Sequence, residues 1–127
     1  GETTFVITDA GMNDLVRPAF YGSYHMIVPV RRRGTAGFVA DIVGPICQSG
    51  DFFARSRHLP CAVAPGDLLA IASAGAYCSS MASTYNSRRR PCEILVDGVR
   101  AAVVRKRDSF EDLWRNEDVR GRRRPTS

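Results

Sequence analysis

Short apolar segments separated by turn-forming residues recur along the chain, and this spacing restricts the fold more than any other feature. Their residues, rich in Val, Ile, Leu and Phe, are typical of strands. The segments cover residues 5–7, 26–30, 37–43, 68–72, 92–96 and 99–105. Asp97-Gly98, which joins the last two, predicts a β-hairpin. The pattern as a whole predicts a mainly β domain, a small Greek-key-like β-barrel or sandwich.

Two segments break this pattern and predict short helices. Residues 13–21 include Arg17-Pro18 and two aromatic residues, and predict a loop with one helical turn. Near the C-terminus two pairs have the spacing of a capping box, Asp108 with Glu111 and Ser109 with Asp112. We therefore expect a short C-terminal helix that closes one end of the barrel.

The length and charge of the chain indicate one domain followed by a basic tail. A chain of 127 residues forms at most one domain, which we place at residues 1–118. The net charge of +5 is concentrated in arginines of residues 119–127, a segment that we expect to be a disordered, solvated tail. No aromatic platform accompanies these arginines, so we expect no nucleic-acid partner. The first residue is Gly rather than Met, and we expect the chain to be a piece of a longer protein.

The composition also bears on compartment and on thiol chemistry. No apolar run approaches the roughly 18 residues that cross a bilayer, and no signal-peptide pattern opens the chain. We therefore expect a cytoplasmic protein with reduced thiols and no membrane partner. The cysteine spacings do not match a zinc site, and three of the four are expected to be small packing residues: Cys61, Cys78 and Cys92.

The fourth cysteine, Cys47, lies in the segment Gly-Pro-Ile-Cys-Gln-Ser-Gly-Asp, between a predicted strand and a turn. A thiol there could donate a proton as a general acid, and Asp51 could orient the loop. The alternative interpretation is a buried cysteine at the end of a strand. The chain offers no obvious electrophile on which such an acid would act.

Three other side chains suit ligand binding. Arg17 and Tyr21 are four residues apart, so one helical turn places them on the same face, where they could bind a carboxylate. The alternative is a surface arginine lying on an aromatic ring. Tyr77 follows small residues at an expected strand end and could hold a phosphate or stack on a ring, unless it is an ordinary edge aromatic. His25 is expected to be packed rather than catalytic.

Four motifs, taken in order, are more specific than any one of them. They read Asp-Ala-Gly-Met-Asn-Asp…Arg-Pro-Ala-x-Tyr, Gly-Pro-x-Cys-x-Ser-Gly-Asp, Pro-Gly-Asp-Leu-Leu…Ala-Gly-Ala-Tyr and Met-Ala-Ser-x-Tyr-Asn-Ser-Arg. Together they closely resemble the C-terminal half of the diaminopimelate decarboxylase family, among the fold-type III, alanine-racemase-like decarboxylases that use pyridoxal 5′-phosphate (PLP). The resemblance covers residues 5 to about 118.

This resemblance implies a C-terminal β-barrel domain whose N-terminal PLP-binding α/β barrel is absent from the chain. The family's activity is decarboxylation of meso-2,6-diaminopimelate to L-lysine and CO2, at a site completed across a homodimer interface. Arg17 and Tyr21 would bind the substrate carboxylate, Cys47 would donate a proton in the partner subunit's site, and Tyr77 would contact PLP and substrate. The family's Schiff-base lysine has no counterpart here, because Lys106 is the only lysine. The chain alone is therefore expected to be inactive.

One position departs from the family pattern. The family has Glu after the cysteine, where a carboxylate can pair with the distal ammonium of the substrate, whereas this chain has Gln48. Gln48 can still accept a hydrogen bond but lacks the charge. Two alternatives therefore stay open: a related PLP decarboxylase for another basic amino acid, against which Arg17 and Tyr21 argue, and a non-catalytic basic β-barrel binding module.

Overall fold

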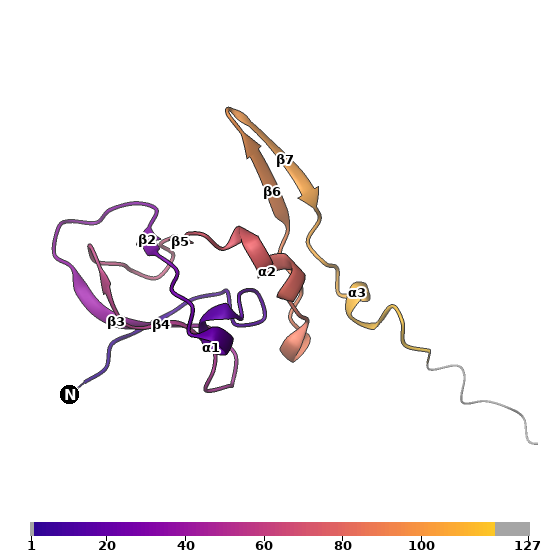
Figure 1. Cartoon of the computed structure of the whole chain (residues 1–127), viewed down its shortest axis with the longest axis horizontal. Coiled ribbons are helices and arrows are strands. Elements are labelled where there is room, and N and C mark those ends of the chain that lie inside the picture. The colour runs from indigo at the N-terminus through magenta and orange to yellow at the C-terminus, as the bar shows by residue number, and fades with distance from the viewer. Residues whose placement is uncertain (1, 119–127) are drawn as a thin grey trace, which may run out of the picture.

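The computed structural model describes residues 2–118, and within them strands predominate. Figure 1 shows an elongated arrangement, with most strands toward the N-terminal end and a hairpin and short helix toward the other. The elements are β1 (Phe5–Ile7), α1 (Arg17–Tyr21), β2 (Ile27–Pro29), β3 (Phe38–Val43), β4 (Phe52–Leu59), β5 (Leu69–Ile71), α2 (Gly75–Met81), the 3-10 turn η1 (Tyr85–Ser87), β6 (Glu93–Asp97), β7 (Arg100–Arg105) and α3 (Glu111–Trp114).

The strands form three sheets. The largest has the order β1-β3-β4, with β1 parallel and β4 antiparallel to β3. The antiparallel pair β2-β5 forms the second sheet, and the antiparallel pair β6-β7 forms the third. One core joins the first two sheets and the segment before α1; its buried members are Leu15, Ile27, Ala40, Ile42, Phe53, Ala54 and Leu59.

The mainly β fold class is thus confirmed, in its sandwich form. Across residues 2–118 the strands pair within separate sheets instead of closing into one barrel. Ile27 of β2 packs in the same core as Ile42 of β3 and Phe53 of β4, as facing sheets of a sandwich do.

The longest strand, β4, has no counterpart among the predicted segments. Its sequence Phe-Phe-Ala-Arg-Ser-Arg-His-Leu lacks a clean alternation of apolar and polar residues. The structural reason is an irregularity in its pairing with β3, where Ser56 has a φ of 47° and its N–H donates to Oδ1 of Asp41 over 2.7 Å. Such a bulge shifts the side chains between faces, so the period of two is lost.

The predicted hairpin is confirmed as β6-β7. Because Asp97 pairs with Arg100, the two loop residues are Gly98 and Val99, one position later than predicted. Gly98 has a φ of 57°, which glycine adopts without a steric penalty. The hairpin projects away from the other sheets in Figure 1, and apolar residues of both strands are exposed: Ile94, Leu95, Val96, Val103 and Val104.

Both predicted helices are present, but the C-terminal one does not close an end of the sandwich. Of the two proposed capping pairs, Ser109 with Asp112 forms: the Ser109 N–H donates to Asp112 Oδ2 over 2.6 Å, and the Asp112 N–H donates to Ser109 Oγ over 3.3 Å. α3 lies beyond the hairpin in Figure 1, and Phe110 and Trp114 are half exposed. The predicted tail at 119–127 lies outside the described residues.

Candidate functional site

The helix α1 carries two of the predicted site residues, Arg17 and Tyr21. Pro18 in the first turn favours helical φ and needs no hydrogen-bond acceptor there. Gly22 ends the helix with a φ of 63°, and its N–H donates to the Pro18 carbonyl over 3.0 Å. The predicted helical turn is therefore fixed at both ends by local chemistry.

The structure brings Arg17 together with Tyr77, a residue 60 positions later in the chain. The central guanidinium carbon of Arg17 lies 5.3 Å from the centre of the Tyr77 ring, within the range of a cation–π contact. Tyr21 is exposed and packs edge-on against Phe20, with ring centres 4.9 Å apart. The alternative interpretation, an arginine that lies on an aromatic ring, thus agrees with this contact. The ring is that of Tyr77.

Tyr77 does not lie at a strand end, as predicted, but in the first turn of the segment α2. Ala76 has φ −71° and ψ 129°, and Tyr77 has φ 63° and ψ 0°. These angles define a type II turn whose third position normally takes glycine. A tyrosine held there costs on the order of 1–3 kcal/mol, a strain that concentrates at functional sites. Ser73, four residues earlier, also has a positive φ, which explains why the strand ends at Ile71.

Cys47 lies at the tip of a closed loop between β3 and β4. The Gln48 N–H donates to the Ile46 carbonyl over 2.7 Å, which makes Cys47 the central residue of a three-residue γ-turn. The Gly44 N–H donates to the Asp51 carbonyl over 3.0 Å and closes the base of the loop. Cys47 is a free, exposed thiol, so the alternative of a buried cysteine at a strand end is wrong.

Gln48 is also exposed, and its side chain folds back on its own loop. Its Oε1 accepts the Gly50 N–H. One of the two lone pairs of this oxygen is therefore used by the backbone. A glutamate at this position would offer a second oxygen and a negative charge.

Four of the five predicted site residues, Tyr21, Cys47, Gln48 and Tyr77, are exposed, and Arg17 is half-buried. Tyr21 is 61% exposed and Tyr77 is 63% exposed. Two cavities, of about 740 and 190 Å³, are lined by other residues. This arrangement supplies polar and aromatic groups for a site whose remaining walls would come from other protein material.

Behind α2, buried polar contacts tie the first motif to the last. Asn13 is 2% exposed; its Oδ1 accepts from Arg88 Nε over 3.0 Å, and its carbonyl accepts from the Ser83 N–H over 2.9 Å. Arg88 also donates to the Asp9 carbonyl. The sequence analysis did not predict this role of Asn13 and Arg88. The available indication was that Asn13 belongs to the first of the four motifs and Arg88 to the last.

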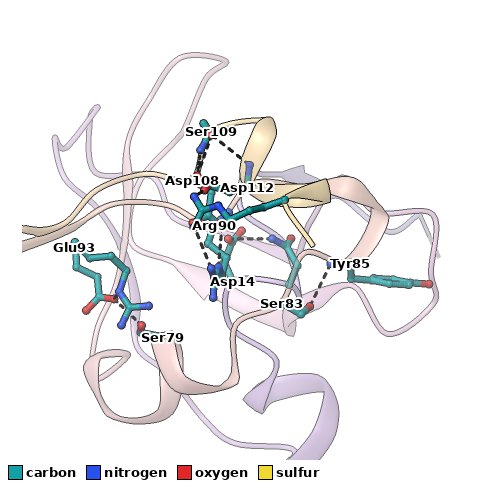
Figure 2. A network of polar contacts seen from close by, with 12 residues as sticks. Asp14, Ser79, Ser83, Tyr85, Arg90, Glu93, Asp108, Ser109 and Asp112 are labelled. Atoms are coloured by element: carbon teal, nitrogen blue, oxygen red, sulfur yellow. Dashed lines mark hydrogen bonds and ion pairs between the residues drawn. The ribbon is translucent and has the colours of Figure 1, made fainter. Parts of the chain in front are cut away.

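The polar network continues toward the C-terminal hairpin (Figure 2). Ser79 Oγ donates to Glu93 over 2.5 Å, and Arg105 pairs with the same carboxylate at 2.6 Å. Arg90 pairs with Asp108 at 2.7 Å, and this ion pair holds the pKa of Asp108 below its usual range. The Ser79–Glu93 hydrogen bond joins α2 to the hairpin, and the Arg90–Asp108 pair joins the segment before the hairpin to the segment after it.

Cys78 and His25 are structural. Burial, with the charges of Asp14 and Glu93, raises the pKa of the Cys78 thiol, which donates to the Asp14 carbonyl over 3.0 Å. His25 is 2% exposed, and its ring lies 3.3 Å from Ser23 Oγ and 3.1 Å from the Ala72 carbonyl oxygen. The prediction that His25 is packed is confirmed.

The residues that build these loops match a known family. Residues 1–75 match the profile described as pyridoxal-dependent decarboxylase, C-terminal sheet domain. The chain belongs to this family. The resemblance drawn from the four motifs is therefore confirmed at the level of the family, and PLP is the cofactor of its members.

Individual relatives agree with the family assignment. The chain is 54% identical over 113 residues to the diaminopimelate decarboxylase of Zymomonas mobilis, covering 89% of this chain and 26% of that protein. Among solved structures, AQ1208 of Aquifex aeolicus superposes with a TM-score of 0.88 at 46% identity, over 91% of this chain and 28% of that one. The diaminopimelate decarboxylase of Helicobacter pylori in complex with L-lysine gives a TM-score of 0.81 at 46% identity, over 88% and 27%.

A lysine/ornithine decarboxylase of Vibrio vulnificus is less similar. It superposes with a TM-score of 0.61 at 25% identity, over 71% of this chain and 25% of that one. The chain thus spans about a quarter of the length of these relatives.

Across residues 2–118, no helix has both the length and the apolar character needed to span a membrane. The same range holds no group of three or more His, Cys, Asp or Glu side chains placed to bind a metal ion.

Proposed function

We propose that residues 1–118 are the C-terminal domain of a diaminopimelate decarboxylase, which converts meso-2,6-diaminopimelate to L-lysine and CO2 together with an N-terminal PLP-binding barrel. The observation that carries this proposal is the contact between the half-buried Arg17 and the exposed ring of Tyr77, which a strained turn holds in place. The similarity to diaminopimelate decarboxylases over most of the chain supports it.

The proposed substrate has an amino-acid group at each end, so the site needs a group that reads the distal carboxylate. Arg17 offers two parallel N–H donors, which match a carboxylate better than a point charge does. Tyr21, one turn later on α1, adds a phenolic donor. Lysine and ornithine lack a distal carboxylate, so Arg17 distinguishes this proposal from a decarboxylase of another basic amino acid.

The residues of this chain also fit a partial PLP site. Lys106, the only lysine, is exposed at the end of β7 and far in sequence from every motif, so the covalent attachment must come from elsewhere. Tyr77 presents an exposed ring and phenol that can contact the cofactor and substrate. When bound, PLP supplies an electron sink for decarboxylation.

Loss of CO2 leaves a carbon that needs a proton, and we assign its delivery to Cys47. A thiol at an exposed loop tip can reach a site formed by a second protein surface, whereas it has no enclosed site on its own chain. We propose that this surface belongs to the partner subunit of a homodimer. The exposed apolar residues of the β6-β7 hairpin offer a face for the absent barrel or that partner.

The test of this function uses the full-length protein with PLP and meso-diaminopimelate. Arg17→Lys keeps the charge but loses the paired donors, and kcat/KM should fall by about 100-fold. The matched control is Arg32→Lys, an exposed arginine of the loop after β2, which should change kcat/KM by less than about twofold. An Arg17→Lys enzyme with unchanged kcat/KM, or a wild-type enzyme that prefers ornithine, contradicts the proposal.

The chain by itself offers a second test. With added PLP it should release no CO2 from diaminopimelate and should not acquire the visible absorbance of a lysine-bound cofactor, since no site lysine is present. A non-catalytic basic module would instead bind oligonucleotides with steep salt dependence. Absence of such binding removes that alternative.

A further inference from the structure

One buried carboxylate, that of Asp51, connects two loops of the proposed site. Asp51 is 5% exposed. Its Oδ2 accepts the Ile46 N–H over 2.5 Å, and its Oδ1 accepts the Met12 N–H over 2.6 Å. Within residues 2–118 no arginine or lysine forms an ion pair with it. Its charge is therefore stabilised by backbone amides of two segments 39 and 5 residues away.

A side chain at either of two neighbouring glycines, Gly44 or Gly11, would press on this carboxylate. A Cβ on Gly44 would lie 2.4 Å from both carboxylate oxygens of Asp51. A Cβ on Gly11 would lie 3.1 Å from Oδ1 of Asp51 and 3.1 Å from Cδ1 of Ile46. Two loops that are far apart in sequence are thus packed closely around a single charged group.

One side of this contact fixes the Cys47 loop. The Ile46 amide held by Asp51 is adjacent to Cys47, and the Ile46 carbonyl accepts the hydrogen bond that closes the γ-turn at Cys47. The Asp51 N–H also donates to the Gln48 carbonyl over 2.9 Å. Asp51 therefore restrains the residues on both sides of Cys47.

The other side of the contact fixes the segment that leads to α1. Met12, whose amide binds Asp51, lies in a turn in which the Asp14 and Leu15 amides donate to the Gly11 carbonyl over 2.9 and 3.2 Å. Arg17 begins α1 two residues after Leu15. The Asp51 carboxylate thus joins the loop of Cys47, the proposed proton donor, to the segment of Arg17, which is proposed to bind the substrate carboxylate.

We propose that Asp51 is a positioning residue, which sets the place of the Cys47 thiol relative to the Arg17 segment and so controls proton delivery. The proposal rests on the proposed function. An asparagine cannot replace it, because one of the two accepting oxygens becomes an NH2 group that faces an N–H donor. The same argument explains why a charged side chain is buried here without a cationic partner.

The experiment is a double-mutant cycle in the full-length enzyme with PLP. Asp51→Asn should lower kcat at least tenfold when Cys47 is present, and by less than about twofold in a Cys47→Ala background, because the residue acts through the thiol. Asp41→Asn is the matched control, since Asp41 also accepts a backbone amide, that of Ser56, but outside the Cys47 loop. The control should have the same effect in both backgrounds.

A purely structural role gives a different result: Asp51→Asn would lower kcat by the same factor with and without Cys47, and this outcome overturns the proposal. If Asp51→Asn does not fold, Gly11→Ala replaces it, since the added Cβ displaces the carboxylate by only tenths of an ångström. It should give a smaller decrease in kcat that again requires Cys47, and equal decreases in the two backgrounds overturn the proposal.

A labelling experiment separates failure of this proposal from failure of the proposed function. In the 127-residue chain, iodoacetamide should label Cys47 at least threefold faster in Asp51→Asn than in the wild type, because the loop is no longer anchored. Labelling of Cys92, also exposed, should not change. An unchanged rate at Cys47 overturns the positioning role, whatever substrate the full-length enzyme uses.

Discussion

The guanidinium of Arg17 lies over the ring of Tyr77, with 5.3 Å between its central carbon and the ring centre. This contact joins the start of α1 to the strained turn that opens α2, so that two motifs from distant parts of the chain meet at the surface, with Arg17 half-buried and Tyr77 exposed. The charge of Arg17 remains available at that surface, since an aromatic ring leaves the guanidinium N–H groups unpaired at their outer edge. We interpret this surface as part of a site completed by other protein.

The turn at Tyr77 predicts that glycine there gives a more stable protein than alanine does, the reverse of the usual order in a helix. Because Tyr77 has a φ of 63°, Tyr77→Gly should be more stable than Tyr77→Ala by about 1 kcal/mol, since only glycine adopts that angle without strain. At Ser80, an exposed residue of the same helix, alanine should be more stable than glycine by about the same amount. Urea unfolding of the four variants measures both differences, and the same ranking at both positions contradicts the strained turn.

The loop position of Gln48 predicts that a glutamate there would improve substrate binding. In the full-length enzyme, Gln48→Glu should lower KM for meso-diaminopimelate roughly tenfold, because one carboxylate oxygen can bind the Gly50 N–H while the other pairs with the substrate ammonium. Ser49→Glu adds the same charge one residue later and should leave KM within about twofold. An unchanged KM for Gln48→Glu shows that this position does not read the ammonium.

The raised pKa of Cys78 predicts a loss of stability at alkaline pH. Above about pH 8.5 an unfolded thiol loses its proton, whereas burial keeps the folded thiol protonated, so the free energy of unfolding falls as pH rises. Cys78→Ala should lose less stability than the wild type between pH 7 and pH 10, as measured by urea unfolding. Cys92→Ala, which removes an exposed thiol, should show the wild-type dependence. Equal slopes for wild type and Cys78→Ala would exclude this linkage.

The cysteines should also differ in their accessibility to reagents. Cys47 and Cys92 are exposed, whereas Cys61 is fully buried and Cys78 is partly buried. Mass spectrometry after brief iodoacetamide treatment should therefore find the label on Cys47 and Cys92 first, and on Cys61 only after unfolding. Early labelling of Cys61 would contradict its burial.

The strands that could be predicted from sequence are those whose apolar residues stand beside clear turn signals, as in β3 and the β6-β7 hairpin. β4 could not, because the bulge at Ser56 breaks its alternation and its arginines pack on neighbours: Arg57 lies 4.2 Å from the Tyr24 ring centre and donates to the His25 carbonyl. The order of apolar and polar residues along one segment does not predict such contacts with residues far away in the sequence.

The candidate site shows the same division. The motifs of Arg17, Cys47 and Tyr77 could be recognised from residue order, and the suggestion that Asp51 orients its loop agrees with the hydrogen bonds of its carboxylate. The positive φ of Tyr77 and its contact with Arg17 could not be predicted, because both depend on how α1 and α2 meet in space. A tyrosine in a left-handed conformation runs against local preference, and only the folded structure reveals it.

We propose that this domain supplies Cys47 to an active site that belongs to a second subunit. The most direct test mixes two full-length variants and measures release of CO2 from meso-diaminopimelate. One carries Cys47→Ala, which leaves a low but measurable activity, and in the other the PLP-binding lysine of the N-terminal barrel is replaced. If Cys47 acts across the dimer, each mixed dimer regains one complete site, and activity should return to about a quarter of the wild-type value at equal amounts. If the mixture is no more active than its two components although mixed dimers form, Cys47 does not act in the partner's site.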